Sequence, residues 1–213
     1  MDKALNLSSS DYAWLLTIFY ISYIVFEPLV FMWKLVPPHY WASFVVFGWG
    51  IIATLQSATT TWSGMMACRF FLGAIEAGYG TGIPYLLSFF YLRHEVGLRI
   101  GLFFSAAPLA NTFAGALAYG ITSGQSRLAN WRLLFLVEGL PTLVMVPVVF
   151  FFLPDSPDKA RFLTEDERAV AKARGVKQVG DKKRVGSLDW KDVAAALSDP
   201  KCWFTAVCII MTI

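Results

Sequence analysis

The chain has 213 residues, of which 56% are hydrophobic and only 15% charged, and its formal net charge is +3. A soluble domain of this length would not need to bury so much apolar surface, so the composition indicates a membrane protein. Nucleic acid is not a predicted partner, because the net charge is small and membrane topology accounts for the basic residues.

Long apolar blocks predict five complete membrane-spanning helices, since a helix needs about 20 apolar residues to cross the hydrocarbon. A sixth block starts at Cys202 and reaches the last residue after twelve residues, too few to cross. Asp199 and Pro200 mark the start of that helix, as an N-cap followed by proline at the first helical position. The five complete spans cover residues of about 11–33, 41–61, 64–91, 98–122 and 133–153.

The distribution of Lys and Arg predicts the orientation, because these residues are retained on the cytoplasmic side. They follow the first span as Lys34, the third as Arg93 and Arg99, and the fifth in the run from Lys159 to Lys201. The segment 154–199 is therefore predicted to be a cytoplasmic linker, with the N-terminus outside. No cleavable signal sequence precedes the first span, so we expect a further helix upstream in a longer parent protein.

The cytoplasmic linker is predicted to hold two short helices. Thr164 and Glu167 have the spacing of a capping box, and Gly175 is expected to end the helix that they begin. A second helix is expected to start near Ser187. We interpret the basic run 182–184 as part of a solvated linker, with contact to anionic lipid head groups as the alternative.

Catalytic and metal-binding patterns are absent from the sequence. His39 and His94 are expected in short turns, without Cys or carboxylate partners at metal-ligand spacing. The three cysteines all lie in apolar blocks, which argues against a disulfide framework. The sequence therefore predicts neither an enzyme nor a bound cofactor or metal.

The third apolar block carries two opposite charges, Arg69 and Glu76. Seven helical residues advance about 10 Å and return to within roughly 20° of the same direction, so the two share one face. A central charge facing lipid costs at least ~2.5 kcal/mol, and both are therefore expected to face protein or water. One interpretation is a structural polar network, through Asn111 of the next span. The other is a site in which Arg69 holds an anionic substrate and Glu76 carries a coupled proton.

Small residues in the third and fourth spans indicate close helix packing. Gly78 and Gly82 lie in G-x-x-x-G register, and Gly115, Ala118 and Gly120 form a similar surface. Such surfaces let helix backbones approach closely, and packing is our interpretation of them.

Three segments carry a family resemblance: "RFFLGAIEAGYGTGIPYLLSFFYLRHEVGLRIGLFF", "NWRLLFLVEGLPT" and "LPDSPDKARFLTEDER". In order and spacing the chain resembles the fungal allantoate permease group of the major facilitator superfamily, the anion:cation symporters. The resemblance implies an all-α polytopic membrane protein with a partial major facilitator fold. The chain would supply the second to sixth transmembrane helices and the beginning of the seventh.

The same resemblance implies a function. The parent protein would be a secondary active transporter that moves a small organic anion, a carboxylate such as a vitamin or ureide, by proton symport across the plasma membrane. The expected partners are the anion, the proton, the lipid bilayer and the missing C-terminal half of the carrier. The alternatives are a non-transporting scaffold or receptor, and an inactive partial gene product. The candidate substrate or proton-coupling residues are Arg69, Glu76, Asn111 and Tyr23, and the gating candidates are Glu27, Lys34, Arg93 and Arg99.

The sequence also departs from the family pattern. The superfamily motif after the second helix is replaced by "FEPLVFMWKLVPPHYW", in which Glu27 is expected to cap a helix or pair with Lys34 or Arg99. Thr81 stands where the family commonly has proline. Because the antiporter motif of the fifth helix is not reproduced, symport is favoured. Glu138 of the last complete span is interpreted as structural.

Overall fold

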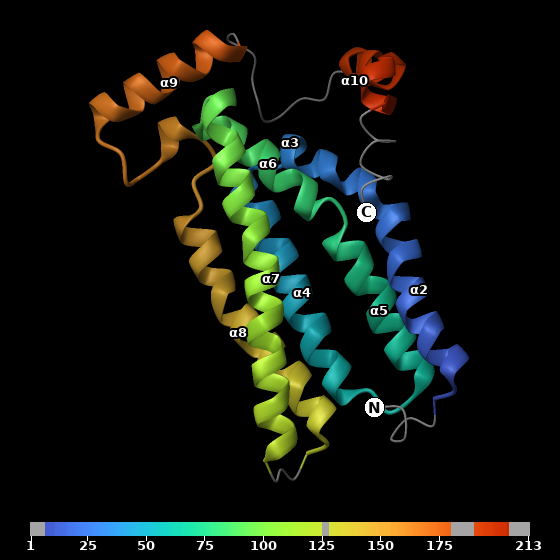
Figure 1. Ribbon diagram of the computed structural model, residues 1–213. Helices are drawn as coiled ribbons and strands as arrows, with labels where there is room; N and C mark the ends of the chain where they lie inside the picture. Colours follow the sequence, from blue (N-terminus) through green and yellow to red (C-terminus); the bar gives the residue numbers. More distant parts are fainter. Residues whose placement is uncertain (1–6, 125–127, 180–189, 205–213) are drawn as a thin grey trace.

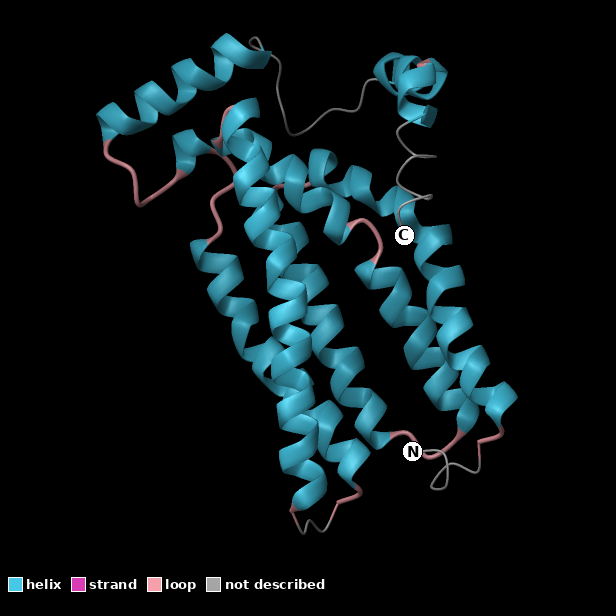
Figure 2. Cartoon of the chain, viewed as in Figure 1, coloured by secondary structure: helices cyan, strands magenta, loops and turns pink. Residues whose placement is uncertain are grey.

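The computed structural model describes residues 7–124, 128–179 and 190–204, which consist entirely of helices and loops (Figures 1 and 2). The all-helical fold predicted from the sequence is therefore confirmed. The helical bundle consists of α2 (Ser9–Phe26), the 3-10 helix η1 (Glu27–Phe31), α3 (Met32–Leu35), α4 (Pro38–Ala58), α5 (Trp62–Glu76), α6 (Tyr79–Phe90), α7 (Arg93–Ser123) and α8 (Asn130–Phe152). It is followed by η2 (Pro157–Lys159), α9 (Glu165–Val179) and α10 (Trp190–Ser198).

Four helical stretches among the described residues are long and apolar enough to cross a membrane. They overlap the first, second, fourth and fifth spans expected from the sequence. Their bounds are Ser9–Leu35, Pro38–Ala58, Arg93–Ser123 and Asn130–Phe152.

The expected third span, 64–91, is not one continuous helix. It is divided into α5, of 15 residues, and α6, of 12 residues. Between them Ala77 is extended, and Gly78 has φ 72°, in the left-handed region that glycine adopts without steric cost. Gly78 thus breaks the helix, a role that its G-x-x-x-G spacing did not indicate.

The indole of Trp33 holds the break in place. Trp33, from α3, is fully buried, and its Nε1 donates a hydrogen bond of 3.1 Å to the carbonyl of Gly78. A Cβ at Gly82 would collide with the same indole, and one at Gly78 would collide with the backbone of Val30. Both glycines are therefore needed for the close approach of η1 and α3 to the start of α6.

Helices α2 and α5 form one closely packed pair (Figure 1). The hydroxyl of Ser22 donates a hydrogen bond of 2.6 Å to the carbonyl of Phe70. Gly73 faces the carbonyl of Phe19 so closely that a Cβ would meet it. Backbone contact of this kind is the expected use of small residues between membrane helices.

Helices α4 and α8 form a second close pair, which is the most extensive helix contact in the described chain. Gly50 of α4 packs against Leu143, and Gly139 of α8 packs against the backbone of Thr54. The two pairs meet where Gly48 of α4 contacts Ile75 of α5.

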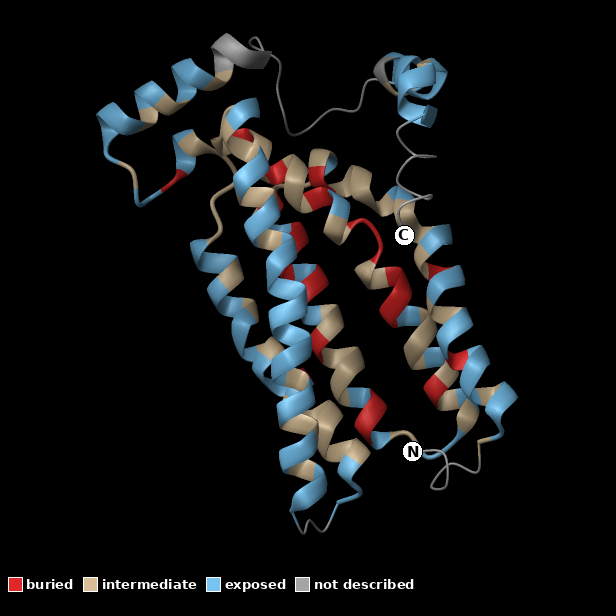
Figure 3. Ribbon diagram, viewed as in Figure 1, coloured by how far each residue is buried: buried red, intermediate tan, exposed pale blue. Residues whose placement is uncertain are grey.

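Buried residues gather on α4, on α5 and around the break, while α7 has no buried residue (Figure 3). Nothing lies within 4 Å of a Cβ built at Gly115 or Gly120. The small-residue surface expected on this span therefore has no packing partner among the described residues.

Helix α9 begins as the sequence predicts. The backbone N–H and the hydroxyl of Thr164 both donate to Oε2 of Glu167, each over 2.9 Å, and these bonds hold the pKa of Glu167 below its usual range. The expected end at Gly175 is wrong, because α9 continues to Val179. A glycine inside a helix costs only about 1 kcal/mol relative to alanine, so a helix can continue through it.

Of the two helix starts expected after α9, the structure describes the one at Asp199 and Pro200. Oδ1 of Asp199 accepts a hydrogen bond of 2.9 Å from the backbone N–H of Lys201, and Pro200 begins a helical turn, which confirms the expected N-cap. The expected helix start near Ser187 and the basic run 182–184 lie outside the described residues. So does most of the last apolar block, from residue 205 onward.

We predict that Gly78→Ala destabilises the fold. An alanine at φ 72° costs roughly 1–2 kcal/mol in backbone strain, and its Cβ would also collide with Val30. The midpoint of thermal unfolding in detergent should therefore fall. Gly97→Ala, a substitution with no atom within 4 Å of the new Cβ, is the control and should not lower it. An equal midpoint for both variants would contradict the role of Gly78.

The orientation gives a second prediction. In a variant without Cys68, Cys202 and Cys208, a single cysteine replacing Thr60 should react with an impermeant reagent in intact cells. One that replaces Lys172 should react only after permeabilisation, because α9 is expected in the cytoplasm. The reverse pattern would overturn the assignment.

Candidate functional site

Arg69 lies on α5 and interacts with α8 and with the start of α2. Its Cζ is 6.0 Å from the centroid of the Phe135 ring, and its charge interacts with Glu138 and Tyr12. Its Nε is buried and has no hydrogen-bond partner among the described residues. Arg69 is thus a half-buried cation whose donors are incompletely satisfied.

Glu76 ends α5, directly before the break, and is half-buried. Tyr23 of α2 interacts electrostatically with both Glu76 and Glu27. The hydroxyl of Thr81, on α6, donates a hydrogen bond of 3.2 Å to Oε1 of Glu27. Oε2 of Glu27 is buried without a hydrogen-bond partner in the described chain. Two carboxyl groups, a phenol and a hydroxyl therefore surround the break, and we call Tyr23, Glu27, Glu76 and Thr81 the break cluster.

The two charges that the sequence singled out do not pair with each other: no ion pair joins Arg69 to Glu76 among the described residues. Their separation along α5 is about 10 Å, too long for a direct contact. Arg69 interacts with α8, whereas Glu76 joins the break cluster with α2. The expectation that each finds partners on another helix agrees with this arrangement.

Asn111 does not form the network considered for it. It is exposed on α7, and within the described chain no hydrogen bond links it to Arg69. The partners of Arg69 in the described chain come from α2 and α8 instead.

Within the described residues Glu27 accepts a hydrogen bond from Thr81 and forms no ion pair with Lys34 or Arg99. Arg99 packs over the ring of Tyr91, with its Cζ 3.9 Å from the centroid, and donates to the Glu95 carbonyl over 2.8 Å. Lys34 ends α3 and is half-buried, and Arg93 begins α7 and is exposed.

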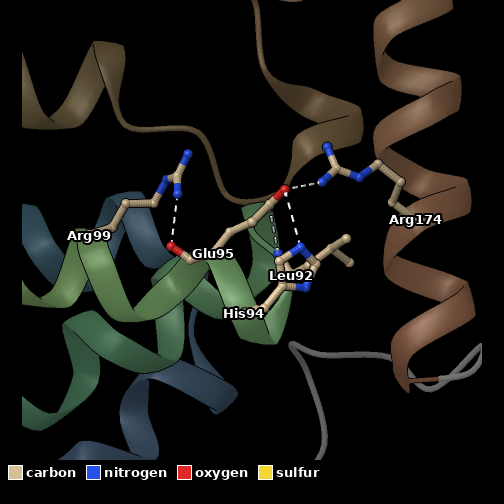
Figure 4. Close-up of polar contacts among 5 residues, drawn as sticks. All are labelled: Leu92, His94, Glu95, Arg99 and Arg174. Atoms are coloured by element: carbon tan, nitrogen blue, oxygen red, sulfur yellow. Dashed lines mark hydrogen bonds and ion pairs between the residues drawn. The ribbon is translucent and has the colours of Figure 1, made fainter.

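Glu95 links α7 to α9 (Figure 4). Its Oε1 is 2.6 Å from Nη2 of Arg174, and its Oε2 accepts a hydrogen bond of 3.1 Å from the backbone N–H of Leu92. The carboxylate thus caps the start of α7 while it binds α9. Sequence reasoning missed this ion pair, because its partners lie 79 residues apart.

A second contact at this end of the bundle joins the start of α4 to the chain after α8. Oδ1 of Asp155 is 2.6 Å from Nδ1 of His39 and accepts a bond of 3.2 Å from its backbone N–H. Oδ2 of Asp155 is 3.6 Å from Nζ of Lys159. His39 therefore has a carboxylate partner that sequence spacing could not reveal, although no metal-binding group of His, Cys, Asp or Glu is found within the described residues.

Comparison with known proteins identifies the family. The model of the Major Facilitator Superfamily matches residues 1–213. The chain belongs to the Major Facilitator Superfamily. Membership explains the all-helical fold with its helices long enough to span a membrane.

Several transporters are similar to this superfamily member. It is 32% identical over 202 residues to the MFS-type transporter efuF of Hormonema carpetanum, covering 90% of this chain and 41% of that protein. It is 33% identical over 201 residues to the MFS transporter prlL of Fungal sp. (strain NRRL 50135), covering 93% and 40%. A "Putative tartrate transporter" of Agrobacterium vitis is 33% identical over 184 residues, covering 84% and 41%. The chain thus spans about 40% of the length of these relatives.

We predict that Glu95→Gln loosens α9. The substitution removes the charge that binds Arg174 and weakens the cap of α7, so α9 should be released more often. Limited trypsin digestion should then cut faster at the exposed Lys172. Asp158→Asn, the same charge change at an exposed position without such a contact, serves as control. Equal cleavage rates in both variants would show that the ion pair does not hold α9.

Proposed function

We propose that this superfamily member forms part of a proton-coupled carrier for a small organic anion, of the allantoate permease or anion:cation symporter type. The proposal includes a second helical half that completes the cavity, and a location in the plasma membrane. Carriers of this kind bind substrate between two halves near the middle of the bilayer and expose it alternately to each side.

The observation that carries the proposal is the placement of the charges of α5. Intramembrane charges are costly and mark substrate or ion pathways when they face the protein interior. Arg69 has a buried Nε without a hydrogen-bond partner in the described chain, so it retains donors for an incoming group. A guanidinium can hold a carboxylate through two parallel hydrogen bonds, and it keeps its charge throughout. We assign Arg69 the role of anion binding.

The break cluster supports the proposal that Glu76 couples the movement of a proton to that of the anion. Glu76 and Glu27 both interact with Tyr23, so two carboxyl groups share a small region of the bundle. Ionisable side chains that face the interior of a membrane protein are the usual members of proton pathways. Glu76 is assigned the coupled proton, with Tyr23 and Glu27 adjusting its environment.

The break between α5 and α6 is also suited to act as a hinge during transport. At the break the Trp33 indole binds the backbone carbonyl of Gly78, and the side chains of Thr81 and Glu27 are joined by a hydrogen bond, in place of a continuous helix. Changes in φ and ψ at a few residues at the ends of helices are the usual means of bending during transport. We assign Gly78 to a hinge, and the contacts of Glu95, Arg93 and Arg99 to the cytoplasmic gate.

The relatives' names offer limited support for the substrate class. One similar protein carries tartrate in its printed name, and tartrate is a small carboxylate. A carboxylate is also the group that a fixed arginine recognises best. We therefore take a small carboxylate as the substrate class of this carrier.

The decisive experiment measures uptake by the complete carrier that contains this chain. Arg69→Lys should weaken the apparent affinity for the carboxylate by roughly tenfold, because lysine keeps the charge but loses the bidentate geometry. Glu76→Gln should preserve exchange of substrate across the membrane but abolish accumulation driven by a pH gradient, since glutamine cannot release a proton.

Glu165→Gln provides the matched control, as an exposed carboxyl group on α9 outside the membrane-spanning bundle. It should leave both properties unchanged. If Arg69→Lys and Glu76→Gln fold normally and retain parental affinity and proton dependence, both assignments are wrong and the charges serve packing alone.

A further inference from the structure

A hollow of about 500 Å³ lies where the chain leaves α8, on the same end of the bundle as α9. Its walls come from the last turn of α8, the segment that follows it, and the first turn of α4. They combine the aromatic rings of Phe150, Phe151, Phe152 and Phe162 with the polar side chains of His39, Asp155, Lys159 and Arg161. None of these residues takes part in the proposed anion site or break cluster.

The carboxylate of Asp155, the acidic group that lines the hollow, already has partners. Asp155 contacts His39 through Oδ1 and Lys159 through Oδ2, over 2.6 Å and 3.6 Å. Arg161, by contrast, is exposed and makes no hydrogen bond or ion pair with any described residue. The hollow therefore presents an uncompensated guanidinium, with the ammonium of Lys159 close by. Its polar side fits a ligand that carries a negative charge.

The apolar side of the hollow extends along α8. Phe151, Phe152 and Phe162 are exposed by 64%, 79% and 70% of their surfaces. Phe151 and Phe152 belong to a helix long and apolar enough to span the membrane, and they lie at its end. Hydrocarbon therefore meets the protein beside the rings, while Lys159 and Arg161 lie beyond the helix end at the level of the lipid head groups.

We propose that this hollow binds an anionic phospholipid of the cytoplasmic leaflet. The phosphate and the charged head group contact Arg161 and Lys159, and the acyl chains pack along the exposed rings of α8. The His39–Asp155 pair fixes the segment after α8 against the start of α4, and so holds the basic side chains at this height.

The hollow combines a basic side with an aromatic side, and this combination fits a phospholipid better than a free phosphate. A soluble anion would use only Arg161 and Lys159, and two exposed basic side chains give weak, salt-sensitive binding in water. A phospholipid adds apolar contact with the phenylalanines, and it is supplied at high concentration by the membrane itself. The aromatic wall has no role in binding a free anion.

The test uses the purified chain in nanodiscs of phosphatidylcholine that contain a small fraction of photo-crosslinkable phosphatidylserine. Mass spectrometry should locate crosslinks on residues 150–162. Arg161→Gln should reduce this labelling about fivefold, the effect of one basic residue at an anionic membrane surface. Lys172→Gln, an exposed lysine of α9 that does not line the hollow, is the matched control and should leave the labelling unchanged.

Two further arms separate the sources of the negative charge. Photo-crosslinkable phosphatidylcholine, which carries no net charge, should label residues 150–162 weakly and equally in all variants. Excess inorganic phosphate should not displace phosphatidylserine. The proposal is overturned if Arg161→Gln labels like the parent, if phosphatidylcholine labels as strongly as phosphatidylserine, or if inorganic phosphate abolishes the labelling.

Discussion

The hydrogen bond from the Trp33 indole to the carbonyl of Gly78 lies at the point on which the rest of the bundle depends. A continuous helix from Trp62 to the end of α6 at Phe90 would have 29 residues, but the break divides it into helices of 15 and 12 residues. The left-handed glycine ends α5, and the indole occupies the space beside Gly82. The Gly78 carbonyl accepts this bond in addition to the first bond of α6, from the Gly82 N–H over 3.1 Å. The buried indole N–H of Trp33, which would be costly to leave unpaired, is thereby satisfied.

This constraint determines where the charges lie. Because α5 stops at Glu76, that carboxyl group stands at a helix end beside Tyr23 and Glu27 instead of within a regular helix. Thr81, just beyond the break, reaches Glu27 by a hydrogen bond. Arg69 is far enough along α5 to interact with α8 instead. Arg69 and the carboxyl group of Glu76 therefore face different neighbours, although both belong to α5.

The end of the bundle that bears α9 combines an apolar cluster, with Trp33, Trp41 and Phe89 at its centre, with polar contacts around it. Glu95 joins α9 to α7, and Asp155 joins the chain after α8 to His39 of α4. Exposed ion pairs are individually weak and sensitive to salt. Contacts of this strength can break and form again as helices move, whereas the glycine contacts within each helix pair allow little rearrangement. Polar contacts between stable pairs suit a region that opens and closes.

The sequence by itself determined the helical class, the approximate extent of the apolar spans, the capped start of α9 and the interest of Arg69 and Glu76. These features depend on composition, on local capping and on the cost of charge in a membrane, which are properties of neighbouring residues. Only the tertiary structure decided that Gly78 breaks the third span, that Glu27 pairs with Thr81, and that His39 pairs with Asp155, 116 residues away. Such contacts depend on which helices pack together, and the spacing of residues along the chain does not show which helices will do so.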